Sequence, residues 1–168
     1  AFDLRLADGG APTDLGAIGA CVREHLDGDH PLVPWAASLG AAAPSRALAG
    51  HLTGFVDLVA RVGDTFVVVD YKPNRLGGYG PAELAAATAA HHYPLQALLY
   101  LVATHRILRW RLAAYDPAVH LGGIAYLFLR GLRPDAPTGP SGEVPGVFAW
   151  SPPVALVDDL SDLLEGLG

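Results

Sequence analysis

The stretch Gly54-Phe-Val-Asp-Leu-Val-Ala-Arg-Val-Gly-Asp-Thr-Phe-Val-Val-Val-Asp-Tyr-Lys72 decides how this chain folds. Two largely apolar runs, 52–62 and 65–72, flank the dipeptide Gly63-Asp64. This pattern is typical of a β-hairpin with a two-residue turn, because Gly accepts the positive φ that such turns require. The sequence therefore predicts an antiparallel strand pair with its turn at Gly63-Asp64.

The register of this hairpin decides which side chains share a face. Val62 faces Thr65 across the turn, so Asp57 lies directly opposite Asp70. Side chains of a strand alternate between its faces, and Lys72 therefore points the same way as Asp70. We expect the opposite face to be the buried one, because it is apolar. Its residues are Val56, Leu58, Ala60, Val62, Val67 and Val69.

Two carboxylates and an ammonium on one hairpin face suggest a hydrolytic site. Directly opposed carboxylates repel unless something compensates, and a divalent cation bound by both would do so. Carboxylate oxygens are ligands that Mg²⁺ and Mn²⁺ prefer, and Lys72 can stabilise a developing anion or position a water. This combination suits metal-assisted hydrolysis of a phosphodiester. The pattern alone leaves a second interpretation open: an exposed polar face with a chance Asp57–Asp70 pair and a salt bridge to Lys72.

Length and composition limit the classes of protein to consider. A chain of 168 residues is expected to form one domain, and no apolar run is long enough to span a membrane. The single cysteine, Cys21, excludes a disulfide framework and a cysteine-rich metal site, and no signal peptide pattern is present, so we expect a reduced, cytoplasmic setting without a membrane partner. The net charge of −6 argues against a broad DNA-binding surface of the chain's own, although other parts of a larger assembly could hold DNA.

Apolar periodicity outside the hairpin predicts an alternation of helices and strands. We expect helices at 14–26, 35–39, 81–90, 94–112 and 152–164, and strands at 1–6, 122–129 and 147–150. Within the long fourth helix, Gln96 and Tyr100 are four residues apart and therefore lie on one helix face. From spacing alone they could be a buried tyrosine with an amide partner.

Two segments of the hairpin carry a resemblance to a known family. Gly54-Phe-Val-Asp-Leu-Val59 and Val69-Asp-Tyr-Lys-Pro-Asn74 resemble motifs of the C-terminal nuclease domain of the RecB subunit of RecBCD (exodeoxyribonuclease V), which has a PD-(D/E)xK site. The resemblance runs in order from about Phe2 to Leu164, and although a DxK motif alone is weak, the ordered set is specific. Further matching segments are Tyr93–Tyr100, His105-Arg106, Tyr115-Asp116, His120–Gly123 and Tyr126–Gly131.

The resemblance implies an α/β, restriction-endonuclease-like fold with a mixed central sheet flanked by helices. It implies that Asp57, Asp70 and the main-chain carbonyl of Tyr71 hold Mg²⁺, with Mn²⁺ as an alternative, and that Asp70 and Lys72 act in catalysis. In the family, a Gln-x-x-x-Tyr motif lies beside the metal. Gln96 and Tyr100 match it, so they are expected to hold substrate or to orient Lys72.

The function implied is that of a metal-dependent exodeoxyribonuclease in double-strand break repair and recombination. It would cut DNA unwound by an attached helicase motor, together with RecC-like and RecD-like subunits. The family also uses a histidine and an acidic residue upstream of the region that Phe2 matches. We therefore expect residues 1–168 to be a single nuclease domain, a C-terminal fragment of a longer helicase–nuclease that lacks its upstream metal-ligand segment and could be inactive alone.

Two rival functions remain at this point. The first is a catalytically inactive nuclease-like module that docks subunits or guides DNA. The second is a different metal-dependent phosphoesterase. The presence of Asp57, Asp70 and Lys72 together favours catalysis over the inactive module.

Overall fold

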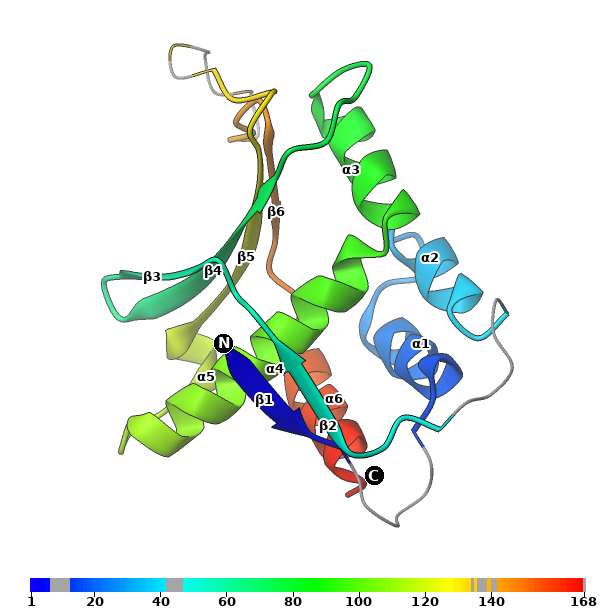
Figure 1. The fold of residues 1–168 in the computed structure, drawn as a ribbon, viewed down its shortest axis with the longest axis vertical. Helices are drawn as coiled ribbons and strands as arrows, with labels where there is room; N and C mark the ends of the chain where they lie inside the picture. The colour runs from blue at the N-terminus through cyan, green and yellow to red at the C-terminus, as the bar shows by residue number, and fades with distance from the viewer. Residues whose placement is uncertain (7–12, 42–46, 134, 136–138, 140–141, 168) are drawn as a thin grey trace.

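A mixed four-stranded sheet, in the order β3-β4-β5-β6, is the centre of the fold (Figure 1). The computed structural model describes residues 1–6, 13–41, 47–133, 135, 139 and 142–167. Strands β3 and β4 are antiparallel, β4 and β5 are parallel, and β5 and β6 are antiparallel, while β1 and β2 form a separate antiparallel pair. The expected α/β class with a mixed central sheet is confirmed. The strands are β1 (Phe2–Arg5), β2 (His51–Gly54), β3 (Leu58–Val62), β4 (Thr65–Lys72), β5 (Leu121–Phe128) and β6 (Val147–Trp150).

Helices pack on one side of this sheet, with α4 running across it (Figure 1). Helix α4 begins at Tyr93 with Pro94 in its first turn, where the missing N–H of proline costs nothing, and its residues Ala97, Leu98 and Leu101 are fully buried. Helix α6 packs against both α1 and α4 and closes the core. No helix in the described part of the chain is long and apolar enough to cross a membrane. The helices are α1 (Leu15–His25), α2 (Val33–Ser38), α3 (Pro81–Ala90), α4 (Tyr93–Arg111), α5 (Pro117–His120) and α6 (Val154–Glu165).

The hairpin has the predicted turn and register. Gly63 has a φ of 63°, and the ladder pairs Val62 with Thr65 and, at its other end, Leu58 with Val69. The paired region ends one residue short of Asp57 and Asp70, which the same register places opposite each other. The local turn chemistry was therefore enough to fix the pairing of these two strands.

The prediction of one continuous strand over 52–62 was wrong, because the chain leaves the sheet at 55–57. Residues 51–54 pair with β1, whereas 58–62 pair with β4. The carbonyl of Phe55 lies in the break, and it accepts a hydrogen bond of 2.7 Å from the hydroxyl of Tyr100 on α4. This side chain replaces the ladder bond that the strand would otherwise have made.

The prediction of which hairpin face is buried was also wrong. Asp70 and Lys72 are only 4% and 6% exposed, and Val68 beside them is fully buried, whereas Leu58 and Val62 on the apolar face are 43% and 69% exposed. The physical reason is that the helices cover the face of Asp70. Burial of these two charges is tolerated there because they compensate each other and are hydrogen-bonded by a helix residue.

Candidate functional site

A buried ion pair lies at the end of β4. The Nζ of Lys72 is 2.7 Å from Oδ2 of Asp70, and it also donates a hydrogen bond of 2.7 Å to Oε1 of Gln96 on α4. Lys72 is the only lysine of the chain. Strand alternation places the two charges on one face, and α4 excludes water from them, so their attraction is much stronger than that of a surface pair. The structure thus brings together three of the residues predicted for the site.

Two tyrosine rings that the sequence analysis did not assign to the site enclose the same ammonium. The Nζ of Lys72 lies 3.8 Å from the ring centroid of Tyr93 and 4.6 Å from that of Tyr126. Tyr126 reaches this position because β5 runs parallel to β4 with Tyr126 beside Asp70. Burial, and secondarily the charge of Asp70, raise the pKa of Tyr126, so its hydroxyl stays protonated and donates. The position of Tyr126 beside Asp70 depends on the parallel register of two strands that are distant in the sequence. Sequence periodicity does not predict that register.

Gln96 and Tyr100 lie on one helix face, as their spacing predicted. Nε2 of Gln96 donates to the hydroxyl of Tyr100 at 2.9 Å, and that hydroxyl donates to the carbonyl of Phe55. Burial and the charges of Asp70 and Asp57 raise the pKa of Tyr100, so its hydroxyl stays protonated and donates. The chain of hydrogen bonds fixes the amide of Gln96 with its oxygen toward Lys72. Its part in holding substrate stays a prediction.

Asp57 lies at the exposed rim of the site. Its Oδ2 accepts a hydrogen bond of 3.0 Å from the backbone N–H of Tyr71, which ties the carboxylate across the hairpin. The side chain of Tyr71 points to the outer face of the sheet, so only its backbone belongs to the site. A metal shared by Asp57 and Asp70 stays a prediction.

The oxygen donors at this point suit a small divalent cation. Mg²⁺ is usually held by one or two carboxylates and keeps several waters, and each ionised carboxylate has about four lone-pair sites. Asp57 accepts from the backbone N–H of Tyr71 and Asp70 contacts the ammonium of Lys72, and these contacts do not use all the lone pairs of the two carboxylates. Among the described residues, no group of three or more His, Cys, Asp or Glu is arranged to hold a metal.

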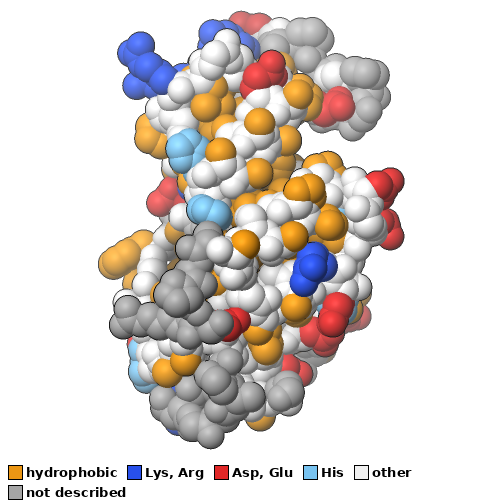
Figure 2. Space-filling model, turned by 90° about the vertical axis from the view of Figure 1, so that its right-hand side faces the viewer, with side chains coloured by type: hydrophobic (Ala, Val, Ile, Leu, Met, Phe, Trp, Pro, Cys, Tyr) orange, Lys and Arg blue, Asp and Glu red, His pale blue; other side chains and the backbone are white. Residues whose placement is uncertain are grey.

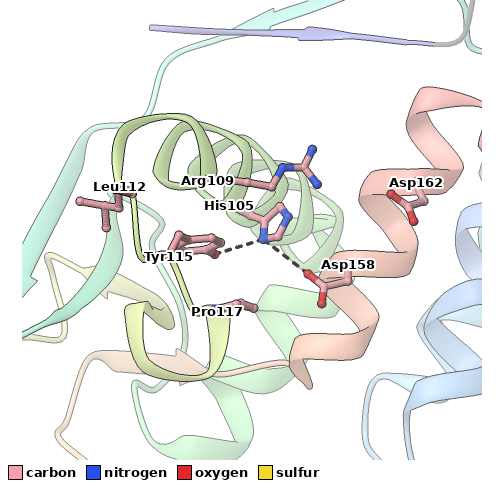
Figure 3. Close-up of a pocket in the computed structure, with 8 residues that line it drawn as sticks. His105, Arg109, Leu112, Tyr115, Pro117, Asp158 and Asp162 are labelled. Atoms are coloured by element: carbon pink, nitrogen blue, oxygen red, sulfur yellow. Dashed lines mark hydrogen bonds and ion pairs between the residues drawn. The ribbon is translucent and has the colours of Figure 1, made fainter.

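A separate pocket lies toward the other end of α4 (Figure 3). It is a cavity of about 490 Å³, and the Nδ1 of His105 within it is 3.1 Å from the hydroxyl of Tyr115 and 3.5 Å from Oδ1 of Asp158. Burial lowers the pKa of His105 and raises that of Tyr115 to about 12. None of the predicted site residues lines this pocket, so it has no direct part in the chemistry at Asp70.

The face of the molecule that carries α1, α2 and α3 has few basic side chains. Figure 2 shows Lys and Arg side chains near one another at the top of this face and an isolated one lower down, with acidic side chains on the same face. This distribution agrees with the net charge of −6. The described residues of this face offer no continuous track for a DNA backbone.

Comparison with known proteins gives one family and a consistent set of relatives. Residues 19–158 match the family described as the PD-(D/E)XK nuclease superfamily. A RecBCD enzyme subunit RecB of Mycobacterium tuberculosis is 47% identical over 98% of this chain, and that of Mycolicibacterium smegmatis is 45% identical over 97%. The RecBCD enzyme subunit RecB of Escherichia coli is 39% identical over 70% of the chain. The chain spans only 16% of the length of the two mycobacterial relatives and 10% of that from Escherichia coli.

Proposed function

This chain belongs to the PD-(D/E)XK nuclease superfamily, and from that premise we propose that it is the nuclease domain of a RecB-type helicase–nuclease that hydrolyses phosphodiester bonds of DNA with Mg²⁺. The observation that carries the proposal is the buried Asp70–Lys72 pair beside Asp57. Asp70 and Lys72 are in contact, and the hairpin register places Asp57 opposite Asp70, a combination that suits metal-assisted hydrolysis of a phosphodiester.

The proposed roles follow from the contacts. Asp57, Asp70 and the carbonyl of Tyr71 would hold the cation. When bound, the cation supplies Lewis-acid charge and a more acidic water. Lys72 stabilises the charge that develops on the phosphate, and it can do so because its ammonium is already desolvated and oriented. Gln96 fixes that orientation through its 2.7 Å hydrogen bond.

Tyr100 supports this arrangement from behind. Its hydroxyl accepts from Gln96 and donates to the carbonyl of Phe55, so it connects α4 to the segment that leads into Asp57. We infer that Tyr100 keeps the two carboxylate-bearing segments at a fixed separation. Such a residue affects cleavage through geometry, because small displacements of reacting groups are costly in rate.

We propose that this domain acts within a larger assembly, whose other parts bind and deliver the DNA. Its relatives are named as subunits of a RecBCD enzyme, so we propose RecC-like and RecD-like partners, double-strand break repair and recombination as its process, and the bacterial cytoplasm as its location. We further propose that residues 1–168 are one nuclease domain of a longer chain, that DNA is delivered by the other parts, and that the products arise by exonucleolytic cutting. The net charge of −6 supports delivery of DNA from elsewhere.

A non-catalytic module for subunit docking or DNA guidance is the second candidate. The observation that favours it is that, among the described residues, no three His, Cys, Asp or Glu side chains are grouped so that they could hold a metal. Asp70→Ala in the full-length polypeptide, assembled with its partners, separates the two candidates. If the domain is a nuclease, the variant loses cleavage of linear duplex DNA in Mg²⁺ and ATP but still unwinds it. If the variant cleaves at the wild-type rate, Asp70 has no metal role and the module is favoured.

A further inference from the structure

We propose that Tyr93 and Tyr126 form an aromatic box that holds the ammonium of Lys72 in its catalytic position. The two tyrosines are thus positioning residues, which act on the reaction through Lys72. The inference rests on the proposed nuclease function, which makes Lys72 the catalytic cation. It adds two residues that neither the spacing of the motifs nor the oxygen donors of the site had indicated.

The geometry of the box is that of two cation–π contacts to one charge. Ring faces attract an ammonium within about 6 Å of the centroid, and the attraction is larger where water is excluded. The distances of 3.8 Å to Tyr93 and 4.6 Å to Tyr126 are well inside this limit, and Lys72 is buried. The two rings also pack against each other, with centroids 5.4 Å apart, and this contact stabilises their arrangement around the ammonium.

The rings are needed because the ion pair alone is a poor restraint once a cation is present. Lys72 has a flexible four-carbon stem, and its ionic partner among the described residues is Asp70. A divalent cation on Asp70 shares the charge of that carboxylate and repels the ammonium. The ring faces and Gln96 attract the ammonium independently of Asp70. They therefore keep it in place under the conditions in which cleavage occurs.

The rings themselves are fixed by hydrogen bonds. The hydroxyl of Tyr126 donates to the carbonyl of Tyr93 at 2.7 Å, and the hydroxyl of Tyr93 donates to Oδ1 of Asn74 at 3.0 Å. His92, directly before Tyr93, has a left-handed φ of 53°, and its Nδ1 accepts a hydrogen bond from Nε1 of Trp35. A left-handed backbone at a histidine is uncommon and needs such support. The turn from α3 into α4 thus sets the ring of Tyr93 over Lys72.

The single lysine makes this box directly observable. In the 168-residue chain prepared with isotope-labelled lysine, one side-chain signal reports on Lys72 alone. We expect its terminal methylene protons to be shifted upfield by the two ring currents, and to stay upfield as MgCl₂ is added. Phenylalanine at position 93 or 126 removes a hydroxyl hydrogen bond but keeps the ring, so most of the upfield shift should remain because the ring still packs against its aromatic neighbours. Tyr93→Leu and Tyr126→Leu each move the signal toward the free-lysine position, and further in Mg²⁺ than without it.

A matched control is Tyr115→Leu, which removes a half-buried tyrosine ring in the separate pocket. It should leave the Lys72 signal unchanged. Backbone amide spectra of all variants identify any that fail to fold. If a leucine variant does not fold, Tyr93→Phe is compared instead with the same variant carrying one or more fluorine atoms on the ring of residue 93. Fluorination weakens the attraction to a cation at nearly constant shape, and the Lys72 signal should move in proportion. A wild-type signal at the free-lysine position, or one insensitive to both rings, overturns the box.

Cleavage by the full-length polypeptide gives the second readout. Tyr93→Phe should cut at a plateau single-turnover rate close to that of wild type, whereas Tyr93→Leu should be slower by about 5- to 30-fold, with an unchanged KM for DNA. Equal rates for the two variants overturn the positioning role. If even the wild-type assembly fails to cut DNA, the proposed function is wrong, and the lysine signal still decides whether the box exists.

Discussion

Replacing Lys72 by methionine removes one partner of the buried ion pair while keeping an unbranched side chain of similar length. The pair is 2.7 Å apart, and at an effective dielectric constant of about 20 its Coulomb energy is about 6 kcal/mol. Part of that energy offsets desolvation of the two charges. Loss of one member of such a pair typically costs about 3–5 kcal/mol, because the other charge stays buried and uncompensated. We expect Lys72→Met to lower the free energy of unfolding of the 168-residue chain by this amount at neutral pH.

Urea denaturation measures the change, and two comparisons define its origin. Asp64→Asn breaks a surface pair with Arg61 of similar length, 2.9 Å, and should cost no more than about 1 kcal/mol because both side chains are largely exposed. The double variant Asp70→Leu with Lys72→Met removes both charges and should recover most of the loss, since a well-packed apolar pair replaces a buried ionic pair at little cost. A loss for Lys72→Met as small as that for Asp64→Asn would refute the reasoning, because Asp70 would then be solvated.

Three further predictions concern the metal, the helix network and pH. MgCl₂ should raise the midpoint of thermal unfolding of the wild-type chain, and should raise that of Lys72→Met by more; adding Asp57→Asn to either protein should reduce the increase. Equal midpoints with and without Mg²⁺ in every variant would argue against a metal held by Asp57 and Asp70. Tyr100→Phe should cost about 1–3 kcal/mol in urea denaturation, because it leaves the Phe55 carbonyl and the Gln96 amide without their partner, and a neutral effect would show that water replaces the hydroxyl. Burial lowers the pKa of His105 below its ordinary value of 6.5, so the free energy of unfolding should be highest above pH 6.5 and should fall as the pH is lowered below 6.5. His105→Asn should reduce this dependence of the free energy of unfolding on pH, and an unchanged dependence would contradict the assignment to His105.

Features set by neighbouring residues were predictable from the sequence. The turn at Gly63 fixed the pairing of β3 with β4, because a positive φ at that position selects the two-residue hairpin. Helix α4 followed from its apolar spacing and from Pro94 in its first turn. The juxtaposition of Gln96 and Tyr100 followed from helix geometry alone.

Features set by contacts between distant segments were not predictable. Alternation along β4 separated its two faces correctly, but hydrophobicity alone selected the wrong one for burial. Helix α4 covers Asp70 and Lys72 because Gln96 satisfies the ammonium there. The approach of Tyr126 to Lys72 depends on the parallel register of β4 and β5, which shifts at the irregularity between Phe66 and Val68. The extra residue lies in β5 at Gly122-Gly123, where Gly123 has a φ of 87°, so the glycines mark a bulge but do not identify the strand that pairs with β5.

Single-turnover DNA cleavage by the full-length assembly carrying Lys72→Gln, followed across a Mg²⁺ titration, separates a catalytic ammonium from a simple counter-charge. If the ammonium stabilises charge in the transition state, the plateau rate at saturating Mg²⁺ falls by about 10²–10³-fold, while DNA affinity and ATP-driven unwinding change little. Lys72→Arg should also be slow, because the planar guanidinium does not fit the space between Asp70, Gln96 and the two rings. A normal plateau rate for Lys72→Gln, reached at a different Mg²⁺ concentration, would contradict the account and reduce Lys72 to a counter-charge for Asp70.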